Sequence, residues 1–170
     1  MEPSKTNIVI EPSPRRISEI FDEETYHALS SGRDVIILDN DTKEDEFIRA
    51  INGADFIISQ RSLSGEMLDD ADRLKAIFNV EGNFLPNIDY EACQAKNIHV
   101  LTPSGVFALP VAEIALGMAL SLLRGIHTAH IDFLRGQERY GFSGNREAKL
   151  LSEASVGIIG YGDIARSLHG

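Results

Sequence analysis

Residues 155–165 read Ser-Val-Gly-Ile-Ile-Gly-Tyr-Gly-Asp-Ile-Ala, and this stretch carries more structural information than any other in the chain. The apolar run 156–159 predicts a β-strand, and the spacing Gly160-x-Gly162-x-x-Ala165 predicts a tight turn into a helix. In such a turn Gly160 permits the sharp change of direction, and Gly162 leaves the backbone open to a ligand. Ala165 lets the helix pack closely on the strand.

The same turn predicts a phosphate site, because unpaired N–H groups at the start of a helix attract anions. A strand, glycine turn and helix in this order favour a dinucleotide over a turn in a nucleotide-free doubly wound fold. Asp163 is stabilised by the helix dipole, and we expect its side chain to point away from a diphosphate. A complete motif needs an acid about twenty residues further on. Only eight residues follow Gly162, so we expect the chain to be the front part of a longer protein.

Short apolar runs alternate with helical patterns in the first hundred residues. The predicted strands are 8–10, 35–38, 56–58, 76–78 and 98–101, and the predicted helices between them are 16–29, 42–51 with Thr42 as N-cap, 64–71 and 88–95. Right-handed crossovers turn this order into a parallel sheet, which is an α/β, flavodoxin-like arrangement with ligands at the carboxyl ends of its strands. The continuous apolar run 35–38 predicts a strand covered on both faces.

The pattern changes after Thr102, where we expect a domain boundary. Pro110 suits the first turn of a long helix over 110–136. The early part of this helix is apolar nearly all round, so another domain or subunit must cover it. The stretch 106–123 reaches the lower length limit of a membrane span, but it contains Pro110 and Glu113, and a buried interface helix is the favoured interpretation.

Composition excludes several functions. Acidic residues outnumber basic ones by 26 to 16, for a net charge of −10, which argues against nucleic acid or an anionic membrane as partner. The single cysteine, Cys93, excludes an intrachain disulfide and a thiolate metal cluster and fits a reducing cytoplasm. His127 and His130 lack a carboxylate to complete a metal site, and the acids of 39–46 fit a solvated surface.

Several motifs occur in one order: Ile77-Phe78, Glu81-Gly82, Asn87-Ile88-Asp89-Tyr90, the run 111–116 and the glycine turn. With them the chain resembles the D-isomer-specific 2-hydroxyacid dehydrogenases, which include phosphoglycerate dehydrogenase-like and glyoxylate reductase-like enzymes. The resemblance covers roughly residues 54–170. It implies an oxidoreductase that acts on the CH–OH group of a small D-2-hydroxy acid, or reduces the 2-oxo acid, with NAD or NADP.

The resemblance also implies an organisation and a site. A flavodoxin-like substrate-binding domain is expected at 1–102, followed over 103–170 by an interface helix and the first β-turn-α unit of a truncated Rossmann domain. The helix 110–136 is expected to form a homodimer. Backbone amides of Glu81 and Gly82 are expected to hold the substrate carboxylate, and Arg61 is expected either to face the substrate or to be a surface cation. The cofactor pyrophosphate is expected at Gly160, Tyr161, Gly162, Asp163 and Ile164. The family's catalytic Arg, acid and His lie in its later segment, so we expect no catalytic residue and no turnover in this chain alone.

A second function stays open at this point: an NAD-responsive binding or corepressor-type protein of the same fold. Two positions favour it. Glu81 places an acid where small apolar residues are commoner, and it would repel an anionic substrate unless turned outward. Ala108 stands where many relatives carry a Thr that touches the nicotinamide.

Overall fold

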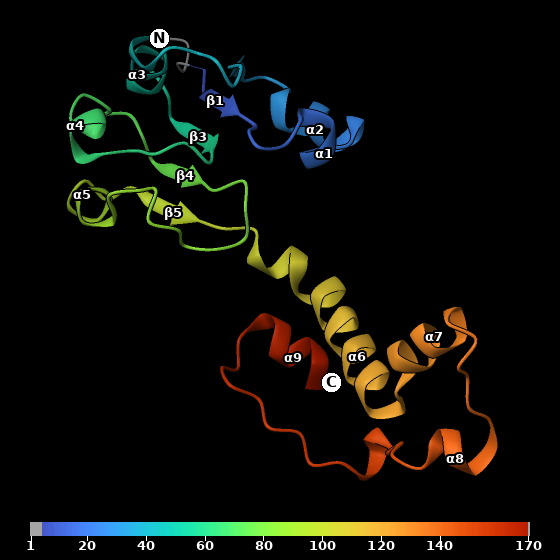
Figure 1. Cartoon of the computed structure of the whole chain (residues 1–170). Coiled ribbons are helices and arrows are strands. Elements are labelled where there is room, and N and C mark those ends of the chain that lie inside the picture. Colours follow the sequence, from blue (N-terminus) through green and yellow to red (C-terminus); the bar gives the residue numbers. More distant parts are fainter. Residues whose placement is uncertain (1–4, 170) are drawn as a thin grey trace. The chain divides into compact units, whose positions relative to one another are not determined.

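The computed structural model of the protein describes residues 5–169. The chain divides into two compact units, the first ending at Ser104 and the second beginning at Gly105. The first unit holds five strands, β1 to β5, and the second consists of helices and loops (Figure 1).

The first unit is built on one parallel sheet of five strands. The strands are β1 (Asn7–Glu11), β2 (Asp34–Ile37), β3 (Phe56–Ser59), β4 (Ala76–Phe78) and β5 (His99–Leu101). Their order across the sheet is β2-β1-β3-β4-β5, and every pair is parallel. This is the flavodoxin-like order, in which the chain reverses its direction of winding between β1 and β3. The α/β fold predicted from the alternation of apolar runs is therefore confirmed.

One face of the sheet carries the hydrophobic core. Val9, Ile57 and Ile77 pair in register across the three central strands, and all three are fully buried. The helices that supply the rest of this core are α3 (Glu44–Asn52), α4 (Gly65–Leu68) and α5 (Tyr90–Ala95), through Phe47, Ile51, Leu68 and Cys93. Burial of the Cys93 thiol, and then the nearby Asp89 charge, raise its pKa, so it behaves as a small apolar residue.

The other face of the sheet is only partly covered. Two short helices, α1 (Ile17–Ile20) and α2 (Glu23–Ser30), lie on this side, and an apolar hollow of about 690 Å³ remains between them and the strands. Ile36 and Ile37 of β2 are each 46% exposed. Because Ile36 and Ile37 point to opposite faces of this edge strand, the prediction that it is covered on both faces is wrong.

The bounds of all four helix predictions in this unit were wrong in detail: α4 covers Gly65–Leu68 and not 64–71, and α5 covers Tyr90–Ala95 and not 88–95. The expected helix 16–29 is broken between α1 and α2, because the Asp22 side chain accepts a hydrogen bond from the Thr25 N–H and caps a new helix there. Hydrogen bonding at this cap lowers the pKa of the Asp22 carboxyl. Helix α3 begins one residue later than expected, so that Lys43 and not Thr42 occupies the N-cap.

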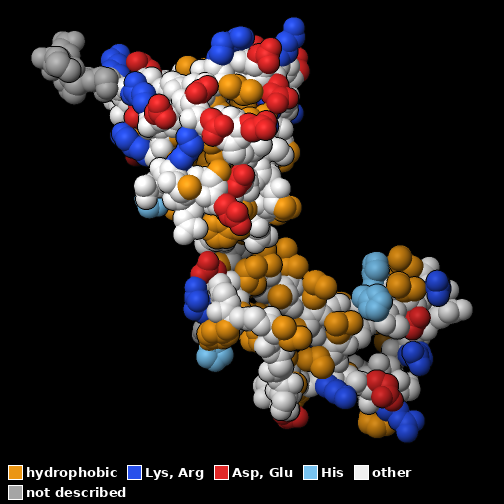
Figure 2. Space-filling model, turned by 90° about the vertical axis from the view of Figure 1, so that its left-hand side faces the viewer, with side chains coloured by type: hydrophobic (Ala, Val, Ile, Leu, Met, Phe, Trp, Pro, Cys, Tyr) orange, Lys and Arg blue, Asp and Glu red, His pale blue; other side chains and the backbone are white. Residues whose placement is uncertain are grey.

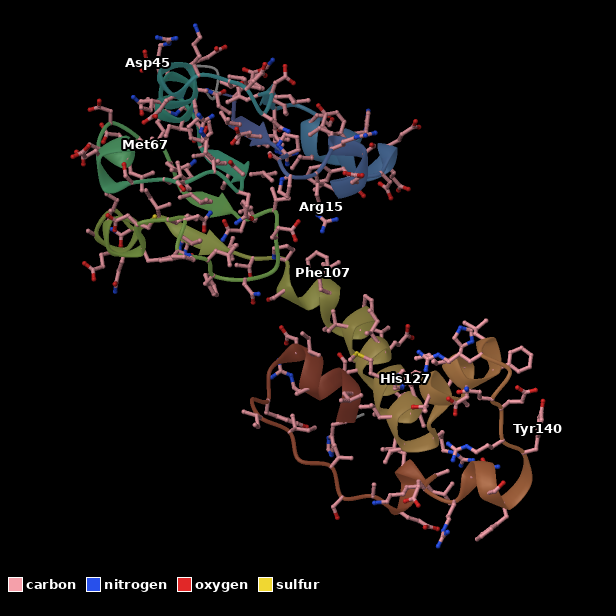
Figure 3. The ribbon with its side chains drawn as sticks, in the orientation of Figure 1. Arg15, Asp45, Met67, Phe107, His127 and Tyr140 are labelled. Atoms are coloured by element: carbon pink, nitrogen blue, oxygen red, sulfur yellow. The ribbon has the colours of Figure 1, made fainter. Side chains whose placement is uncertain are left out.

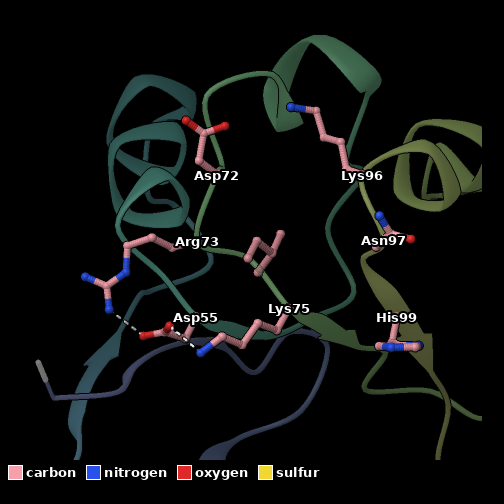
Figure 4. A pocket seen from close by; sticks show the side chains of 8 residues that line it. Asp55, Asp72, Arg73, Lys75, Lys96, Asn97 and His99 are labelled. Carbon is pink, nitrogen blue, oxygen red and sulfur yellow. Dashed lines mark hydrogen bonds and ion pairs between the residues drawn. The ribbon is translucent and has the colours of Figure 1, made fainter. Parts of the chain in front are cut away.

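A buried carboxylate stabilises the amino-terminal edge of the sheet (Figure 4). Asp55 Oδ2 accepts the Asn7 N–H at 2.9 Å and lies 2.8 Å from Arg73 Nη2, while Oδ1 lies 3.0 Å from Lys75 Nζ. Burial alone raises the pKa of the Asp55 carboxyl, but these three donors outweigh it and hold the pKa below its ordinary value. The network ties β1, the start of β3 and the segment before β4 together.

The second unit contains α6 (Ala108–Arg124), α7 (Ile126–Leu134), α8 (Gly141–Asn145) and α9 (Asp163–His169), with 3-10 turns at Ser104–Phe107 and Leu151–Glu153. The expected single helix 110–136 is divided into α6 and α7 by Gly125, whose φ of 61° is left-handed. Helix α9 packs against α6, and Ala165 is the buried residue of α9. Ser104–Arg124 is long and apolar enough to cross a membrane by length and composition, and only 11% of it is buried in the structure.

The strand expected at 156–159 is absent, and the prediction was wrong. A strand needs a neighbour for its backbone hydrogen bonds, and no described strand lies beside this segment. Val156 is 64% exposed and Ile159 is fully exposed. Figure 2 shows apolar side chains gathered over the surface of the second unit, whereas charged side chains are more numerous on the visible face of the first.

Candidate functional site

The carboxyl ends of β1 and β3 bring polar side chains together where the winding of the sheet reverses. Glu11 ends β1, and Ser59, Gln60 and Arg61 end or follow β3. Glu11 and Ser59 are buried, and the Ser59 hydroxyl donates to Glu11 Oε2 at 2.9 Å. In open parallel sheets this is the position where ligands bind.

Arg61, predicted near the substrate, is held from three directions. Its Nη1 lies 3.2 Å from Glu11 Oε1 and donates to the Thr42 carbonyl at 3.0 Å. Its guanidinium also stacks 4.6 Å from the centre of the Phe47 ring. The Arg61 side chain therefore neutralises a buried carboxylate and braces the start of α3.

Glu81, in the loop after β4, pairs with an arginine that the sequence did not single out. Arg15 Nε lies 2.7 Å from Glu81 Oε1, and Arg15 Nη2 lies 3.3 Å from Oε2. Figure 3 shows the Arg15 side chain projecting from the loop that precedes α1. Hydrogen bonding to Glu81, and then the charge of Glu81, raise the pKa of Arg15. The acid expected to repel an anionic substrate is thus neutralised by a partner.

The backbone N–H groups of this loop differ in whether they have a hydrogen-bond acceptor. The Glu81 N–H donates to Gln60 Oε1 at 2.8 Å, and the Asn83 N–H donates to the Glu81 carbonyl at 3.0 Å. Within residues 5–169 the Gly82 N–H between them has no acceptor. Of the two amides expected to hold a carboxylate, Glu81 is engaged by a side chain and Gly82 is available.

Two asparagines extend the network beneath the loop. The buried Asn79 donates through Nδ2 to the Asn83 carbonyl at 3.3 Å. Asn87 donates through Nδ2 to Asn79 Oδ1 at 3.3 Å and to the Gln60 carbonyl at 3.2 Å. The side-chain amides of Asn79 and Asn87 and the guanidinium of Arg15 therefore all hold the loop 81–87 in place.

The glycine turn in the second unit has the backbone that its sequence requires. Gly160 has a φ of 81°, a left-handed conformation that favours glycine. An added Cβ at Gly162 would meet nothing within 4 Å, so packing within the chain does not explain a glycine there. Asp163 pairs with Arg166 one turn along α9, which neutralises the carboxylate next to the turn. Tyr161 and Ile164 are 58% and 43% exposed. The five residues thus form a solvent-exposed turn, and no described atom lies within 4 Å of a Cβ added at Gly160 or Gly162.

Sequence reasoning did not name Arg15, Gln60 or Asn79, and it quoted Asn87 only as part of a family motif. The signal of Gln60 and Asn79 was positional, because each lies within two residues of the end of a predicted strand, at the carboxyl edge where polar side chains converge. Arg15 gave no such signal, because its partner lies 66 residues away.

No other group in the described part of the chain forms a candidate centre. No cluster of three or more His, Cys, Asp or Glu side chains in residues 5–169 could hold a metal ion. A hollow of about 550 Å³ at the amino-terminal edge is lined by Arg73, Lys75 and Lys96. Asp55 engages the first two, and Lys96 donates to the Asp69 carbonyl at the C-cap of α4, so these cations stabilise the fold.

Comparison with known proteins assigns this architecture. The model of the D-isomer specific 2-hydroxyacid dehydrogenase catalytic domain matches residues 9–162. The chain belongs to this family. The family match covers the last three residues of β1, the other four strands, the loop 81–87, and Gly160 and Gly162 of the turn. It includes Ser104–Arg124, the segment whose length and composition alone resemble a membrane span.

Individual relatives agree with the family. Hydroxypyruvate reductase of Thermotoga maritima is 26% identical over 155 residues, which cover 89% of this chain and 49% of the relative. A phosphoglycerate oxidoreductase from Rhizobium etli is 39% identical with a TM-score of 0.75, and the match covers 97% of this chain and 51% of that one. This chain thus spans about half the length of these two proteins.

A more distant structure shares the fold. D-lactate dehydrogenase from Aquifex aeolicus, whose structure was solved with NAD and lactic acid, is 22% identical with a TM-score of 0.67; the match covers 95% of this chain and 46% of that one.

Proposed function

We propose that this chain is the front part of a nicotinamide-dependent oxidoreductase that acts on the CH–OH group of a small D-2-hydroxy acid, or reduces the corresponding 2-oxo acid. The observation that carries the proposal is the family match over residues 9–162. The names of the relatives support a dehydrogenase or reductase and give no support to the binding-protein alternative.

The substrate carboxylate belongs, in this proposal, at the loop 81–87. The Gly82 N–H is available to the carboxylate. Hydrogen bonds from the Glu81 N–H to Gln60 and from the Asn83 N–H to the Glu81 carbonyl position the neighbouring backbone. Arg15 cancels the charge of the Glu81 carboxylate, which would otherwise oppose an anion. Arg61 contributes from below by fixing Glu11 and the end of β3.

The cofactor is NAD, with its pyrophosphate at Gly160, Tyr161, Gly162, Asp163 and Ile164. The residues fit this group, since Gly160 holds the turn, Gly162 leaves the backbone bare and Asp163 is neutralised by Arg166. When bound, NAD accepts or supplies the hydride. The presence of NAD in the D-lactate dehydrogenase structure supports the assignment, and the described residues do not discriminate against NADP.

The groups that move the proton belong to the later segment of the complete protein, as the family resemblance implies. We assign no catalytic residue among these 170, and we expect no turnover from the chain alone. We further propose a substrate-binding domain at 1–102, the start of the NAD-binding domain at 103–170, and a cytoplasmic homodimer formed through 110–136. The exposed apolar residues of α6 support the dimer.

The test is oxidation of NADH by the complete gene product with glyoxylate, pyruvate and hydroxypyruvate. Turnover of at least one 2-oxo acid is expected. Binding of NADH without turnover of any of the three would contradict the enzyme and favour a binding protein.

A further inference from the structure

Gln60 makes a contact that links the switch point of the sheet to the proposed substrate loop. Its Oε1 accepts the Glu81 N–H at 2.8 Å from the end of β3, and its backbone carbonyl accepts the Asn87 side chain at 3.2 Å. Gln60 therefore touches both the first and the last residue of the loop 81–87.

These contacts decide where the Gly82 N–H points. The Gln60 side chain accepts the Glu81 N–H, which orients the peptide between residues 80 and 81. The Asn83 N–H donates to the Glu81 carbonyl, which orients the peptide between residues 81 and 82. In a trans peptide the N–H of Gly82 points opposite to the carbonyl of Glu81. Since the Glu81 carbonyl accepts the Asn83 N–H, the Gly82 N–H points away from Asn83 and stays available to an acceptor outside the loop.

The network is not optimised for stability. Gln60 Nε2 and Asn87 Oδ1 are both buried and have no hydrogen-bond partner within the described residues. An unpaired buried donor and acceptor each cost free energy, and apolar side chains of the same size would avoid this cost. Exceptions of this kind are concentrated at functional sites.

We propose that Gln60 is a positioning residue: through the Glu81 N–H it holds the loop so that the Gly82 amide meets the carboxylate of a 2-oxo or 2-hydroxy acid. The inference rests on the proposed function, because it assigns a role within the same site. Arg61, its neighbour in sequence, faces away toward Glu11 and Phe47 and does not share this role.

The first measurement is amide hydrogen exchange in the complete gene product. In Gln60→Met, protection of the Glu81 amide is lost and exchange rises through 81–87, while the amides of Ile57 and Ile77 stay protected. Gln60→Glu keeps an acceptor at Oε1 and regains the protection at Glu81. Gln94→Met, an exposed glutamine on α5, is the matched control and leaves the loop unchanged. Unchanged protection at Glu81 in Gln60→Met overturns the inference.

The second measurement uses the complete gene product. Gln60→Met raises the KM for the 2-oxo acid about tenfold, while kcat changes less than KM and the affinity for NADH is unaffected. A purely structural role would lower the melting temperature and weaken NADH binding as well. A wild-type protein without turnover overturns the proposed function, and the inference with it. An active wild type whose KM changes less than twofold in Gln60→Met overturns the inference alone.

Discussion

Arg15 Nε lies 2.7 Å from Glu81 Oε1, so that the loop after β1 and the loop after β4 are joined by a charged hydrogen bond. Both side chains are about one third exposed. A pair this exposed adds little to stability. Its larger effect is to cancel a negative charge beside the amide of Gly82.

The first prediction follows from that charge. Arg15→Met leaves the Glu81 carboxylate unpaired, and we expect the KM for a 2-oxo acid to rise about tenfold through repulsion. The melting temperature should shift by less than about 3 °C. In the double variant Arg15→Met/Glu81→Gln the charge is gone, and most of the loss in KM should be recovered. A double variant as poor as Arg15→Met would show that Arg15 acts by another route.

Asp55 predicts how stability depends on pH. Its pKa is lower in the folded chain than in the unfolded one, so its contribution is fully present above about pH 5, where an ordinary Asp is already ionised. The contribution is lost as the pH falls through the lowered pKa. Asp55→Asn should cost about 1–3 kcal/mol in free energy of unfolding at pH 7. Urea titrations at pH 7 and pH 3 should show the difference between wild type and variant shrinking at the lower pH; a constant difference contradicts the network.

Two glycines of the second unit should respond to alanine with opposite signs. Gly125 has a left-handed φ, so Gly125→Ala should destabilise by about 1 kcal/mol. Gly117 lies inside α6, where an added Cβ meets nothing within 4 Å, and Gly117→Ala should stabilise by about 0.5–1 kcal/mol. Thermal unfolding followed by circular dichroism measures both. Equal effects would mean that α6 and α7 do not break at Gly125.

A substitution at Gly162 should change cofactor binding without changing the stability of the fold. Because open space surrounds its Cα, Gly162→Ala should leave the melting temperature unchanged. It should weaken NADH binding to the complete gene product by about tenfold or more, because the new methyl group occupies the approach of the pyrophosphate. Fluorescence titration of NADH measures the affinity, and Gly157→Ala, also in open space, is the control. Equal affinity in the Gly162 variant would place the phosphates elsewhere.

An apolar stripe on α6 predicts the oligomeric state. Ile114, Met118 and Leu122 are four residues apart and each is more than 60% exposed. Ile114→Lys/Met118→Lys should convert the expected dimer of the complete gene product to a monomer, since a buried charge without a partner opposes association. Light scattering after size exclusion measures the mass, with Asn145→Lys on α8 as the control. A dimer that persists places the interface elsewhere.

The sheet was predictable because apolar runs of three or four residues recur between helical patterns, and such runs have few alternatives in a doubly wound fold. Val9, Ile57 and Ile77 lie on the covered face as their spacing requires. The exposure of β2 was not predictable from 35–38, because burial of a strand's faces depends on which helices pack over them. The strand prediction at 156–159 was wrong for a different reason. The residues suit a strand, but a strand requires a neighbouring strand for its backbone hydrogen bonds.

The candidate site, like the sheet, could be predicted only in part from the sequence. Gly82, Gly160 and Gly162 could be named from the chain because their importance lies in their own backbones. Arg15 and Gln60 act through partners that are 66 and 21 residues distant, and no local pattern identifies those partners. The role of Arg61 was the hardest to foresee, since a cation after β3 suits a ligand and the buried Glu11 equally well.

The Asp55 network has a consequence for how this domain can change over evolutionary time. It secures the strands at the edge opposite to the loops 11–15, 60–61 and 81–87. Substitutions at the two edges share no contacts, so their effects on stability should add independently. Mutations that alter which acid is recognised can therefore accumulate at one end of the sheet while the other end keeps the domain folded.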